Sequence, residues 1–579
     1  MTILCSCRNI KKDFVERTVL KDIQLDIREG ERIGLVGRNG SGKTTLANIL
    51  LGKIIPEEGS ILWHQDKIKK GYLHQATFYT ADVFKDMLVN SEGKEKLQGF
   101  FHTSSQMGLE KVQQWHGDRL DRLSGGEKTK LALAAIWAEK PTFLILDEPT
   151  NHLDYQGVQW LIDELKKYKG TVLIISHDRY FLDETVDTII EIDEGMLQHY
   201  QGNYSFYREE KKRRYESQFH AYEVQERYKQ KVAEEIKQLE NWSAKAHRES
   251  RRKQIELGGK KEYYRVKAKK KDKQVKSKLK RLEKLEVEGI AKPKEEAKTH
   301  FAFQQADKRG KRILEAKDIK KSFDQRILFE DSSFYILRGD RVGLFGRNGC
   351  GKTTFVRTLR GEEALDSGHL YISPSVRIGY LSQDVLDLDE EQTVLEALRI
   401  CTGEERSKVG TLLANMGFSN EILQSPIKVL SMGERTRIKI AGLIMENYDM
   451  LILDEPTNHL DLHAREKLEE TLENYEGTIL LVSHDRYMME KLCDKLLTFE
   501  NNGIKRVEYG LKAYLENKEK RSKGMASDHE QTKEEEKLII ENRITVILGE
   551  LSKYDSKDPE YARLDLAFKE LLAKKREWM

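Results

Sequence analysis

Long apolar runs are missing from this chain of 579 residues. The longest ones, TVLIIS after Gly170 and TILLVS after Gly477, have the length of a strand, whereas a membrane-spanning helix needs about 20 apolar residues. Charged residues make up 34% of the chain, as expected of a soluble protein. The first residues, MTILCSCRNIKKDF, also lack the apolar core and cleavage site of a signal peptide. We therefore expect a cytoplasmic protein without membrane spans.

Cysteine is scarce as well. The five cysteines are Cys5, Cys7, Cys350, Cys401 and Cys493. They form no pairs with the spacing of a zinc site, and their odd number argues against a disulfide framework. A reducing compartment fits this usage best.

Proline is absent from the middle of the chain, between Tyr204 and Pro293. The only glycines between Gly202 and Gly289 are the pair 258–259. Apolar residues recur there at steps of three and four, namely Tyr215, Phe219, Tyr222, Val232, Ile236, Leu239, Val275, Leu279 and Leu282. This pattern predicts two antiparallel helices that turn near the glycine pair.

The two predicted helices differ in length. At about 1.5 Å per residue, a helix over 207–257 would span roughly 75 Å and one over 260–288 roughly 43 Å. Either the first helix begins by docking on its own domain, or the tip is partly irregular.

The small net charge of +3 hides a strong local excess of positive charge. Residues 245–281 contain 17 Lys or Arg against 4 Asp or Glu, a net charge of +13. One basic patch on an otherwise acidic chain indicates a surface that binds a polyanion. A merely solvated helix face would mix charges of both signs.

One set of motifs occurs twice, on either side of the basic segment. The first copy reads GRNGSGKTT from Gly37, LSGGE from Leu123, LILDEPTNHLD from Leu144 and SHD from Ser176. The second reads GRNGCGKTT from Gly346, LSMGE from Leu430, LILDEPTNHLD from Leu451 and SHD from Ser483. Equivalent residues are 309 apart at Lys43 and Lys352 and 307 apart at His177 and His484.

Each copy has the order strand, glycine loop, helix, which is typical of an α/β nucleotide-binding domain. We place the first domain at residues 1–203, the linker at 204–305, the second domain at 306–515 and a helical extension at 516–579. Two apolar stripes in the extension predict a small helical hairpin, and its role, packing or binding, stays open.

The glycine loops match the phosphate-binding pattern G-x-x-x-x-G-K-[ST]. Backbone N–H groups of such loops face phosphates, the lysine adds charge and the following threonine ligates Mg²⁺. Asp147 and Asp454 end buried strands and are placed to hold Mg²⁺. Glu148 and Glu455, the next residues, are candidates to polarise the attacking water.

These motifs resemble those of the ABC-type ATPases over nearly all of both domains. The resemblance implies that LSGGE and LSMGE are signature sequences, Gln75 and Gln383 Q-loop glutamines, His177 and His484 switch histidines, and Asp154 and Asp461 D-loop acids. Phe14 and Phe323 each lie 29 residues before a phosphate-loop lysine, the place of the aromatic ring that stacks on adenine. A role in the core is the alternative for these two rings.

The predicted ATP and Mg²⁺ ligands follow from this resemblance. In the first copy the expected ATP-binding residues are Phe14, Gly37, Arg38, Asn39, Gly40, Ser41, Gly42, Lys43, Thr44, Thr45, Gln75, Ser124, Gly125, Gly126 and Glu127. In the second copy they are Phe323, Gly346, Arg347, Asn348, Gly349, Cys350, Gly351, Lys352, Thr353, Thr354, Gln383, Ser431, Gly433 and Glu434. The expected Mg²⁺ ligands are Thr44, Gln75, Asp147, Thr353, Gln383 and Asp454, and the expected catalytic residues are Glu148, Glu455, His177 and His484.

In the ABC family the signature of one domain caps the nucleotide held by the other. The resemblance thus implies two composite sites, with Lys43 opposite Ser431 and Lys352 opposite Ser124. Met432 replaces the first signature glycine of the second copy, so the site of Lys43 is expected to work at a different rate.

The linker between two complete domains, with the twin DEPTNHLD motifs, resembles the ABC-F family of translation factors. Two other classes of ATPase fit less well. An exporter subunit would need a transport partner, and in chromosome-structuring ATPases the coiled coil interrupts one domain. The resemblance implies an ATPase with two ABC-type domains, a helical-hairpin linker and a C-terminal helical hairpin. Its expected partners are the bacterial 70S ribosome with its 23S rRNA and P-site tRNA, and it is expected to act as a monomer.

The basic segment supplies the expected RNA contacts. They are Lys245, Arg248, Arg251, Arg252, Lys253, Lys260, Lys261, Tyr263, Tyr264, Arg265, Lys267, Lys269, Lys270 and Lys271. The two tyrosines either stack on bases or pack between the helices.

Within the family, the choice lies between housekeeping factors and factors that protect ribosomes from antibiotics. The first domain has only 49 residues between Gln75 and Ser124, which leaves no room for the large arm of some housekeeping members. The long linker and the terminal hairpin look like those of resistance members, so we expect ribosome protection against drugs of the peptidyl-transferase centre.

Overall fold

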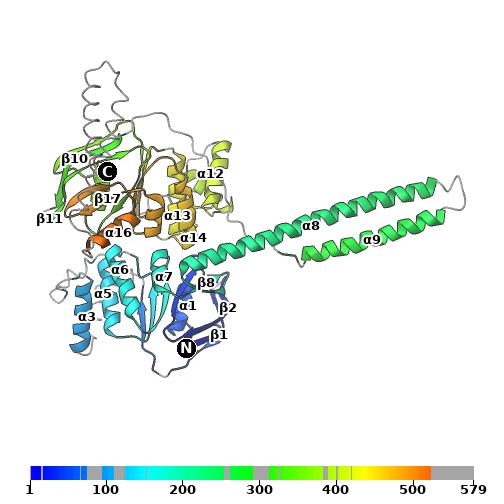
Figure 1. The fold of residues 1–579 in the computed structure, drawn as a ribbon, viewed down its shortest axis with the longest axis horizontal. Coiled ribbons are helices and arrows are strands. Elements are labelled where there is room, and N and C mark those ends of the chain that lie inside the picture. The colour runs from blue at the N-terminus through cyan, green and yellow to red at the C-terminus, as the bar shows by residue number, and fades with distance from the viewer. Residues whose placement is uncertain are drawn as a thin grey trace, which may run out of the picture.

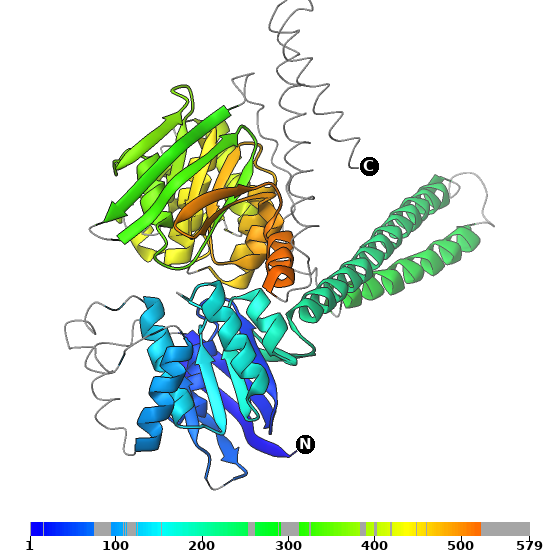
Figure 2. The same ribbon diagram turned by 60° about the vertical axis from the view of Figure 1, so that its left-hand side comes forward.

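The computed structural model describes residues 2–522, apart from 15–16, 66, 75–93, 108, 110–111, 113–122, 124, 152, 253–260, 288, 291–311, 324–325, 383–388, 399–401, 417, 419, 447 and 459. Two α/β domains lie side by side, and a pair of long helices projects away from both of them (Figures 1 and 2). The predicted C-terminal hairpin lies outside the described residues.

A six-stranded sheet in the order β5-β6-β7-β3-β8-β9 forms the centre of the first domain. Its strands are β3 (Arg32–Gly37), β5 (Lys70–Leu73), β6 (Phe143–Asp147), β7 (Thr171–Ile175), β8 (Thr188–Asp193) and β9 (Met196–Gln201). Neighbouring strands are parallel except β8 and β9. Continuous apolar runs such as FLIL in β6 form its middle because both faces of this sheet are covered.

Alternate residues of the central strands enter two different cores. Leu144 and Leu146 of β6 pack toward the helices α3 and α5, whereas Phe143 and Ile145 pack toward a three-stranded antiparallel sheet and α1. That sheet, in the order β2-β1-β4, consists of β1 (Ile3–Phe14), β2 (Arg17–Arg28) and β4 (Glu58–Trp63). The helices are α1 (Lys43–Leu50), α3 (Lys94–Gln106), α5 (Gly125–Ala138), α6 (Tyr155–Lys167) and α7 (Arg179–Thr185).

The second domain repeats this topology, with a sheet in the order β14-β15-β16-β12-β17-β18 and another in the order β11-β10-β13. The strands are β10 (Arg312–Phe323), β11 (Arg326–Leu337), β12 (Arg341–Phe345), β13 (Ser367–Ile372), β14 (Ile378–Leu381), β15 (Met450–Asp454), β16 (Thr478–Val482), β17 (Lys495–Glu500) and β18 (Gly503–Val507). The helices are α10 (Lys352–Leu359), α11 (Val394–Ala397), α12 (Gly403–Asn415), α13 (Met432–Met445), α14 (Leu462–Glu473), α15 (Arg486–Leu492) and α16 (Leu511–Ser522), with short 3₁₀ turns at Asn420–Gln424 and Ile427–Val429.

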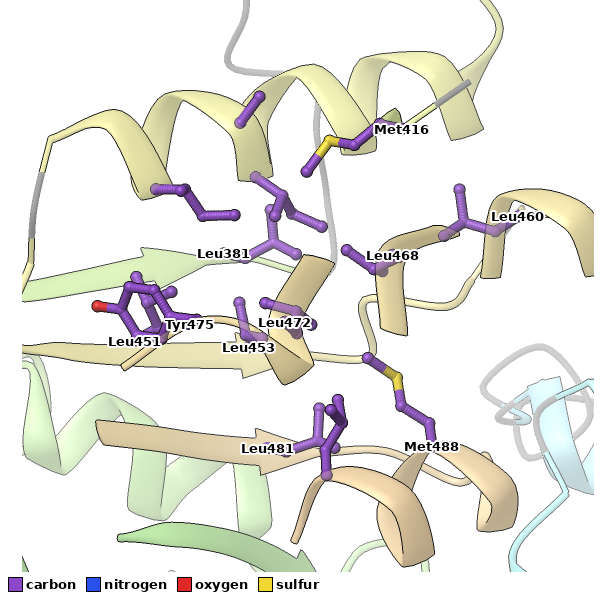
Figure 3. Packing of buried hydrophobic residues seen from close by; sticks show 14 of the residues in the cluster. Leu381, Met416, Leu451, Leu453, Leu460, Leu468, Leu472, Tyr475, Leu481 and Met488 are labelled. Carbon is purple, nitrogen blue, oxygen red and sulfur yellow. The ribbon is translucent and has the colours of Figure 1, made fainter. Parts of the chain in front are cut away.

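The helical side of the second domain is closed by one large apolar core. Figure 3 shows Leu468 and Leu472 of α14 packed over Leu451 and Leu453 of β15. All four side chains are fully buried. Helix α14 is therefore fixed to the body of this domain.

The linker forms an arm of two antiparallel helices, α8 (Tyr204–Arg252) and α9 (Lys261–Val287). The seam between them buries Val232, Ile236 and Val275. Near the root of the arm, the Ile290 N–H donates to Gln225 Oε1 at 2.7 Å. The arm therefore has two helices only beyond Gln225, and the first of the two explanations for the unequal lengths is confirmed, because α8 begins by docking on its own domain.

Within the part of the chain described, no helix is both long and apolar enough to cross a membrane. Cys5, Cys7, Cys350 and Cys493 are free thiols.

Candidate active sites

Each phosphate loop joins the end of a central strand, β3 or β12, to the helix that follows it. Two glycines in each loop adopt left-handed backbone conformations, with φ of 73° and 104° at Gly40 and Gly42 and of 72° and 109° at Gly349 and Gly351. Such turns let successive N–H groups face one anion at a helix N-terminus. Cys350 does not disturb the second loop. Its N–H donates to Arg347 O at 3.3 Å, which is the turn hydrogen bond that this position makes in the loop.

The loop lysines fold back over their own loops. Lys43 Nζ donates to the carbonyl oxygens of Gly37 and Arg38 at 2.8 and 3.0 Å. Lys352 Nζ makes the equivalent bonds at 2.8 and 3.1 Å. Burial lowers the pKa of Lys43, so an anion beside it would restore the stability of its charged form.

Asp147 lies at the end of β6, beside the first phosphate loop. Thr44 Oγ1 donates to its Oδ2 at 3.1 Å, and the Tyr72 hydroxyl donates to the same oxygen at 3.4 Å. Burial raises the pKa of Asp147 and likewise that of Asp454 in the second domain. The Thr44 hydroxyl and the Asp147 carboxylate are the kind of oxygen ligands that Mg²⁺ prefers. A cation bound between them would favour the ionised form of the carboxylate.

The next residue, Glu148 or Glu455, is held in the same way in both domains. The switch histidine, His177 or His484, donates its backbone N–H to the glutamate Oε2 at 3.4 Å and places its Nε2 3.6 Å from Oε1. Burial raises the pKa of Glu148 to about 7 and that of Glu455 to about 8. These values suit a group that accepts a proton from water near neutral pH.

The first site contains buried polar atoms without a hydrogen-bond partner. Among the described residues, Ser41 Oγ, Asp147 Oδ1, Glu148 Oε1 and His177 Nδ1 belong to this group. Buried polar atoms are rarely left without a partner unless a ligand or an ion completes the site. Their clustering around one phosphate loop fits a bound nucleotide with its metal ion.

Phe14 and Phe323 do not belong to the core. Their side chains are 46% and 47% exposed, and Lys12 and Lys321 place their ammonium groups 5.5 and 5.0 Å from the respective ring centres. The ring of Phe323 lines a cavity of about 670 Å³ together with residues 351–354 of the phosphate loop. The geometry suits stacking on a base, which stays a prediction.

The D-loop acids join the two domains across both sites. One oxygen of Asp154 accepts the Gly157 N–H at 3.0 Å and caps α6, while the other accepts the Asn348 N–H of the opposite phosphate loop at 3.3 Å. Asp461 does the same, capping α14 and accepting the Asn39 N–H at 3.1 Å. Each phosphate loop is therefore completed by the other domain.

The second signature sequence forms the N-terminus of α13. Ser431 caps this helix in a reciprocal capping box with Glu434, Met432 is its first residue and Gly433 is buried. In the first copy α5 begins at Gly125, but Ser124, Gln75 and Gln383 lie outside the described residues. The pairing of each signature with the opposite lysine stays a prediction.

The basic side chains of the arm are described in part. Lys245, Arg248, Lys269 and Lys270 are exposed, and Lys271 lies with its Nζ 5.6 Å from the ring of Trp242. The remaining predicted RNA contacts, Arg251, Arg252, Lys253, Lys260, Lys261, Tyr263, Tyr264, Arg265 and Lys267, have side chains outside the described part of the structure.

An ionic cluster between the domains was not predicted from the sequence. Arg179, at the start of α7, donates to Glu469 Oε2 at 3.1 Å and lies 3.4 Å from Asp485 Oδ1, and all three side chains are buried. Arg465 of α14 also contacts Asp485, at 3.4 Å. The motif SHD continues as SHDRY in both copies, and this longer repeat is the signal in the sequence that could have singled out Arg179, although not its partners.

Two phosphate loops, each completed by the other domain's D-loop and each backed by an aspartate, a glutamate and a histidine, define a tandem ABC-type ATPase. A family model described as ABC transporter matches residues 20–151 and 329–458, and a second model with the same description matches 190–262. The ribosome protection protein VmlR of Bacillus subtilis (strain 168) is 39% identical over 580 residues, which cover 100% of this chain and 98% of that protein. ABC transporter F family member 5 of Arabidopsis thaliana is 30% identical and covers 93% of this chain and 81% of its own length.

This chain belongs to the ABC-F family, and it is an ATPase. The solved structure of the RNase-L Inhibitor has a similar fold, with a TM-score of 0.57 and 20% identity, covering 90% of this chain and 92% of that one. The predicted family, fold class and enzymatic activity are thus confirmed.

Proposed function

We propose that this ATPase binds the bacterial ribosome near the tRNA exit site and protects the peptidyl-transferase centre from antibiotics. The observation that carries the proposal is the similarity to a ribosome protection protein, which runs through both domains and the arm, over 100% of this chain. The partners would be 23S rRNA and the P-site tRNA. The protein would act as a monomer in the cytoplasm.

The shape and charge of the arm support this proposal. The arm projects away from both ATPase domains (Figures 1 and 2), and its described lysines at 269 and 270 are exposed. Lysine and arginine side chains on a helix neutralise RNA phosphates, so the interaction should weaken strongly as salt rises. A long basic projection suits a narrow space lined by RNA.

ATP would hold the two domains closed, and hydrolysis would release them. In the closed state the D-loop acids bind the opposite phosphate loops, while Glu148 and Glu455 accept a proton from the attacking water. One Mg²⁺ ion would be held by Asp147 and Thr44 in the first site and another by Asp454 in the second site. Each ion would neutralise charge on the phosphates of its own nucleotide. The protein would thus cycle on and off the ribosome with each round of hydrolysis.

A drug-susceptibility panel tests the function directly. Cells that lack the chain are complemented with the wild type, with Glu148→Gln/Glu455→Gln, or with a protein whose arm is shortened around residues 258–259. We expect the wild type alone to raise resistance to lincosamides, pleuromutilins and streptogramin A. The glutamine variant should sediment with ribosomes in ATP, and the shortened variant should keep its ATPase activity.

Equal susceptibility with and without the wild-type chain would contradict ribosome protection. If susceptibility were equal but the glutamine variant sedimented with ribosomes in ATP, the protein would be a housekeeping translation factor. If that variant stayed free of ribosomes in ATP, ribosome binding itself would be wrong.

A further inference from the structure

Helix α14 of the second domain contacts the first ATP site at its N-terminus. Asp461, its capping residue, accepts the Asn39 N–H of the first phosphate loop at 3.1 Å. Leu462, its first residue, is buried in the apolar core of the first domain. The other face of α14 is anchored in its own domain through Leu468 and Leu472 (Figure 3).

One turn further on, α14 contacts the first two turns of α8, which we call the root of α8. Glu466 Oε1 accepts the Tyr204 hydroxyl at 3.0 Å and lies 2.7 Å from Arg208 Nε. Tyr204 and Arg208 belong to the first two turns of α8, and the Tyr204 ring is buried. The first turns of α8 follow the first domain directly in the sequence, and they are nevertheless bonded to the second domain.

The switch helix α7 closes this connection. It begins with Arg179, two residues after His177, and Arg179 pairs with Glu469 of α14. Further along α7, Asp183 accepts the backbone N–H and the hydroxyl of Ser205 at 2.7 and 2.6 Å. The root of α8 therefore lies between α14 and the helix that follows the first switch histidine.

Among the described residues, the second ATP site lacks the pair of glutamates that makes this connection. At the repeat offset of 307, Glu466 and Glu469 correspond to Gln159 and Ile162 of α6. Arg486, the counterpart of Arg179, pairs with Glu490 of its own helix at 2.7 Å, and its contact with the first domain is to the ring of Tyr180 at 4.2 Å, not to a carboxylate. A cavity of about 640 Å³, lined by Asp154, Tyr155 and the second phosphate loop among others, lies on this side of the interface.

We propose that α14 couples the first ATP site to the arm, with Glu466 and Glu469 as positioning residues that fix the root of α8 when the domains close. The pose of the arm then follows the state of the first site, the one that contains Lys43. The length of the arm amplifies small changes at its root. The 49 residues of α8 span about 73 Å, so a tilt of about 5° moves the far end by about 6 Å.

The coupling can be measured without ribosomes, so its failure would leave the proposed function untouched. Spin labels on non-canonical amino acids at exposed Lys269 and Leu62 report the distance from the arm to the first domain, and labels at Leu62 and Lys505 report domain closure. In the Glu148→Gln/Glu455→Gln background with ATP, we expect one narrow arm distribution. Adding Glu466→Gln or Tyr204→Phe should broaden it about twofold while the closure distance stays the same.

Gln159→Ala, at the position equivalent to Glu466, is the matched control and should leave both distances unchanged. The single variants test the dependence on one site: Glu148→Gln alone should give the narrow arm distribution in ATP, and Glu455→Gln alone should not. An unchanged arm distribution in Glu466→Gln and Tyr204→Phe would overturn the proposal. So would equal broadening by Gln159→Ala, or a loss of closure in parallel with the loss of arm order.

Discussion

At the scale of the residue, the two catalytic glutamates combine backbone strain with burial. Glu148 and Glu455 both have φ of 50°, in the left-handed region that costs a residue with a side chain about 1–2 kcal/mol. Their N–H groups hold them there by donating to Ile175 O and Val482 O at 2.8 Å. The strand thus turns sharply after Asp147 or Asp454, and the glutamate side chain faces the switch histidine instead of solvent.

Burial of these glutamates makes the nucleotide-free protein less stable as pH rises. Their pKa is raised from 4.5 to about 7 and about 8 by burial, so folding favours the protonated form. Their contribution to stability is complete below pH 4.5 and is lost as pH rises through these values. We expect Glu148→Gln/Glu455→Gln to raise Tm by about 3–6 °C at pH 8.5 and by about a third of that at pH 5.5, where only part of this stability has been lost.

Differential scanning calorimetry without nucleotide measures this difference. Glu139→Gln, at an exposed position, is the control and should change Tm little at either pH. The same stabilisation at both pH values would show that the gain does not come from removing a buried charge.

At the scale of the element, the arm is held together by a narrow seam between its two helices. Its buried seam consists of Val232, Ile236 and Val275 among the described residues, supplemented by a hydrogen bond of 2.6 Å from Ser243 to Asp272. Most of its remaining surface is charged. The pairing of α8 and α9 therefore rests on a small apolar seam flanked by polar contacts, among them Lys278 with Glu235 and Arg281 with the ring of Tyr228.

A charge placed in the seam should separate the two helices without affecting the ATPase domains. Val275→Asp buries an unpaired carboxylate, which costs several kcal/mol unless the helices part. We expect α9 to lose its protection from hydrogen exchange, measured by mass spectrometry, while Tyr204 and its neighbours stay protected. Val266→Asp, at a position that is 62% exposed, is the control, and equal loss of protection in both variants would contradict the seam.

The arm also shows how far periodicity reaches. Steps of three and four predicted two antiparallel helices and the seam residues Val232, Ile236 and Val275. Leu279 was also placed in the seam, but the prediction was wrong because its side chain is 38% exposed. Residues 275, 279 and 282 share one face of the helix, but a seam between only two helices has no third element to cover its edge, so a side chain on that face can stay open to solvent.

The motifs predicted the arrangement within each ATP site better than the contacts between domains. Loop glycines, strand-end acids and switch histidines carry their own backbone geometry, and the structure brings them together. Contacts such as Glu469 with Arg179 depend on how two whole domains dock, and no local pattern encodes that choice. The candidate ATP, Mg²⁺ and RNA ligands remain predictions until a complex tests them.

At the scale of the whole molecule, the interface between the domains has a pseudo-twofold arrangement with unequal halves. Leu462 and Tyr155, each the first residue of its helix, occupy equivalent positions. Leu462 is buried in the core of the first domain, whereas Tyr155 is half-buried, packs edge-on against Phe345 at 5.9 Å and lines the interdomain cavity. One half of the interface therefore buries Leu462 and is ionic, with a cavity of about 410 Å³ lined by Arg179, Glu466 and Glu469 among others, and the other half borders a larger cavity of about 640 Å³.

This difference predicts unequal effects of truncation on closure. Leu462→Ala removes a fully packed side chain and should shift the equilibrium toward open domains by about tenfold or more, because such a loss costs about 2 kcal/mol. Tyr155→Ala should shift it by less than about threefold, since its ring already borders empty space. The interdomain distance distribution measured in limiting ATP reports both shifts. A larger shift for Tyr155→Ala would show that the half of the interface around Tyr155 holds the domains together. The contacts at the first site would then not dominate closure.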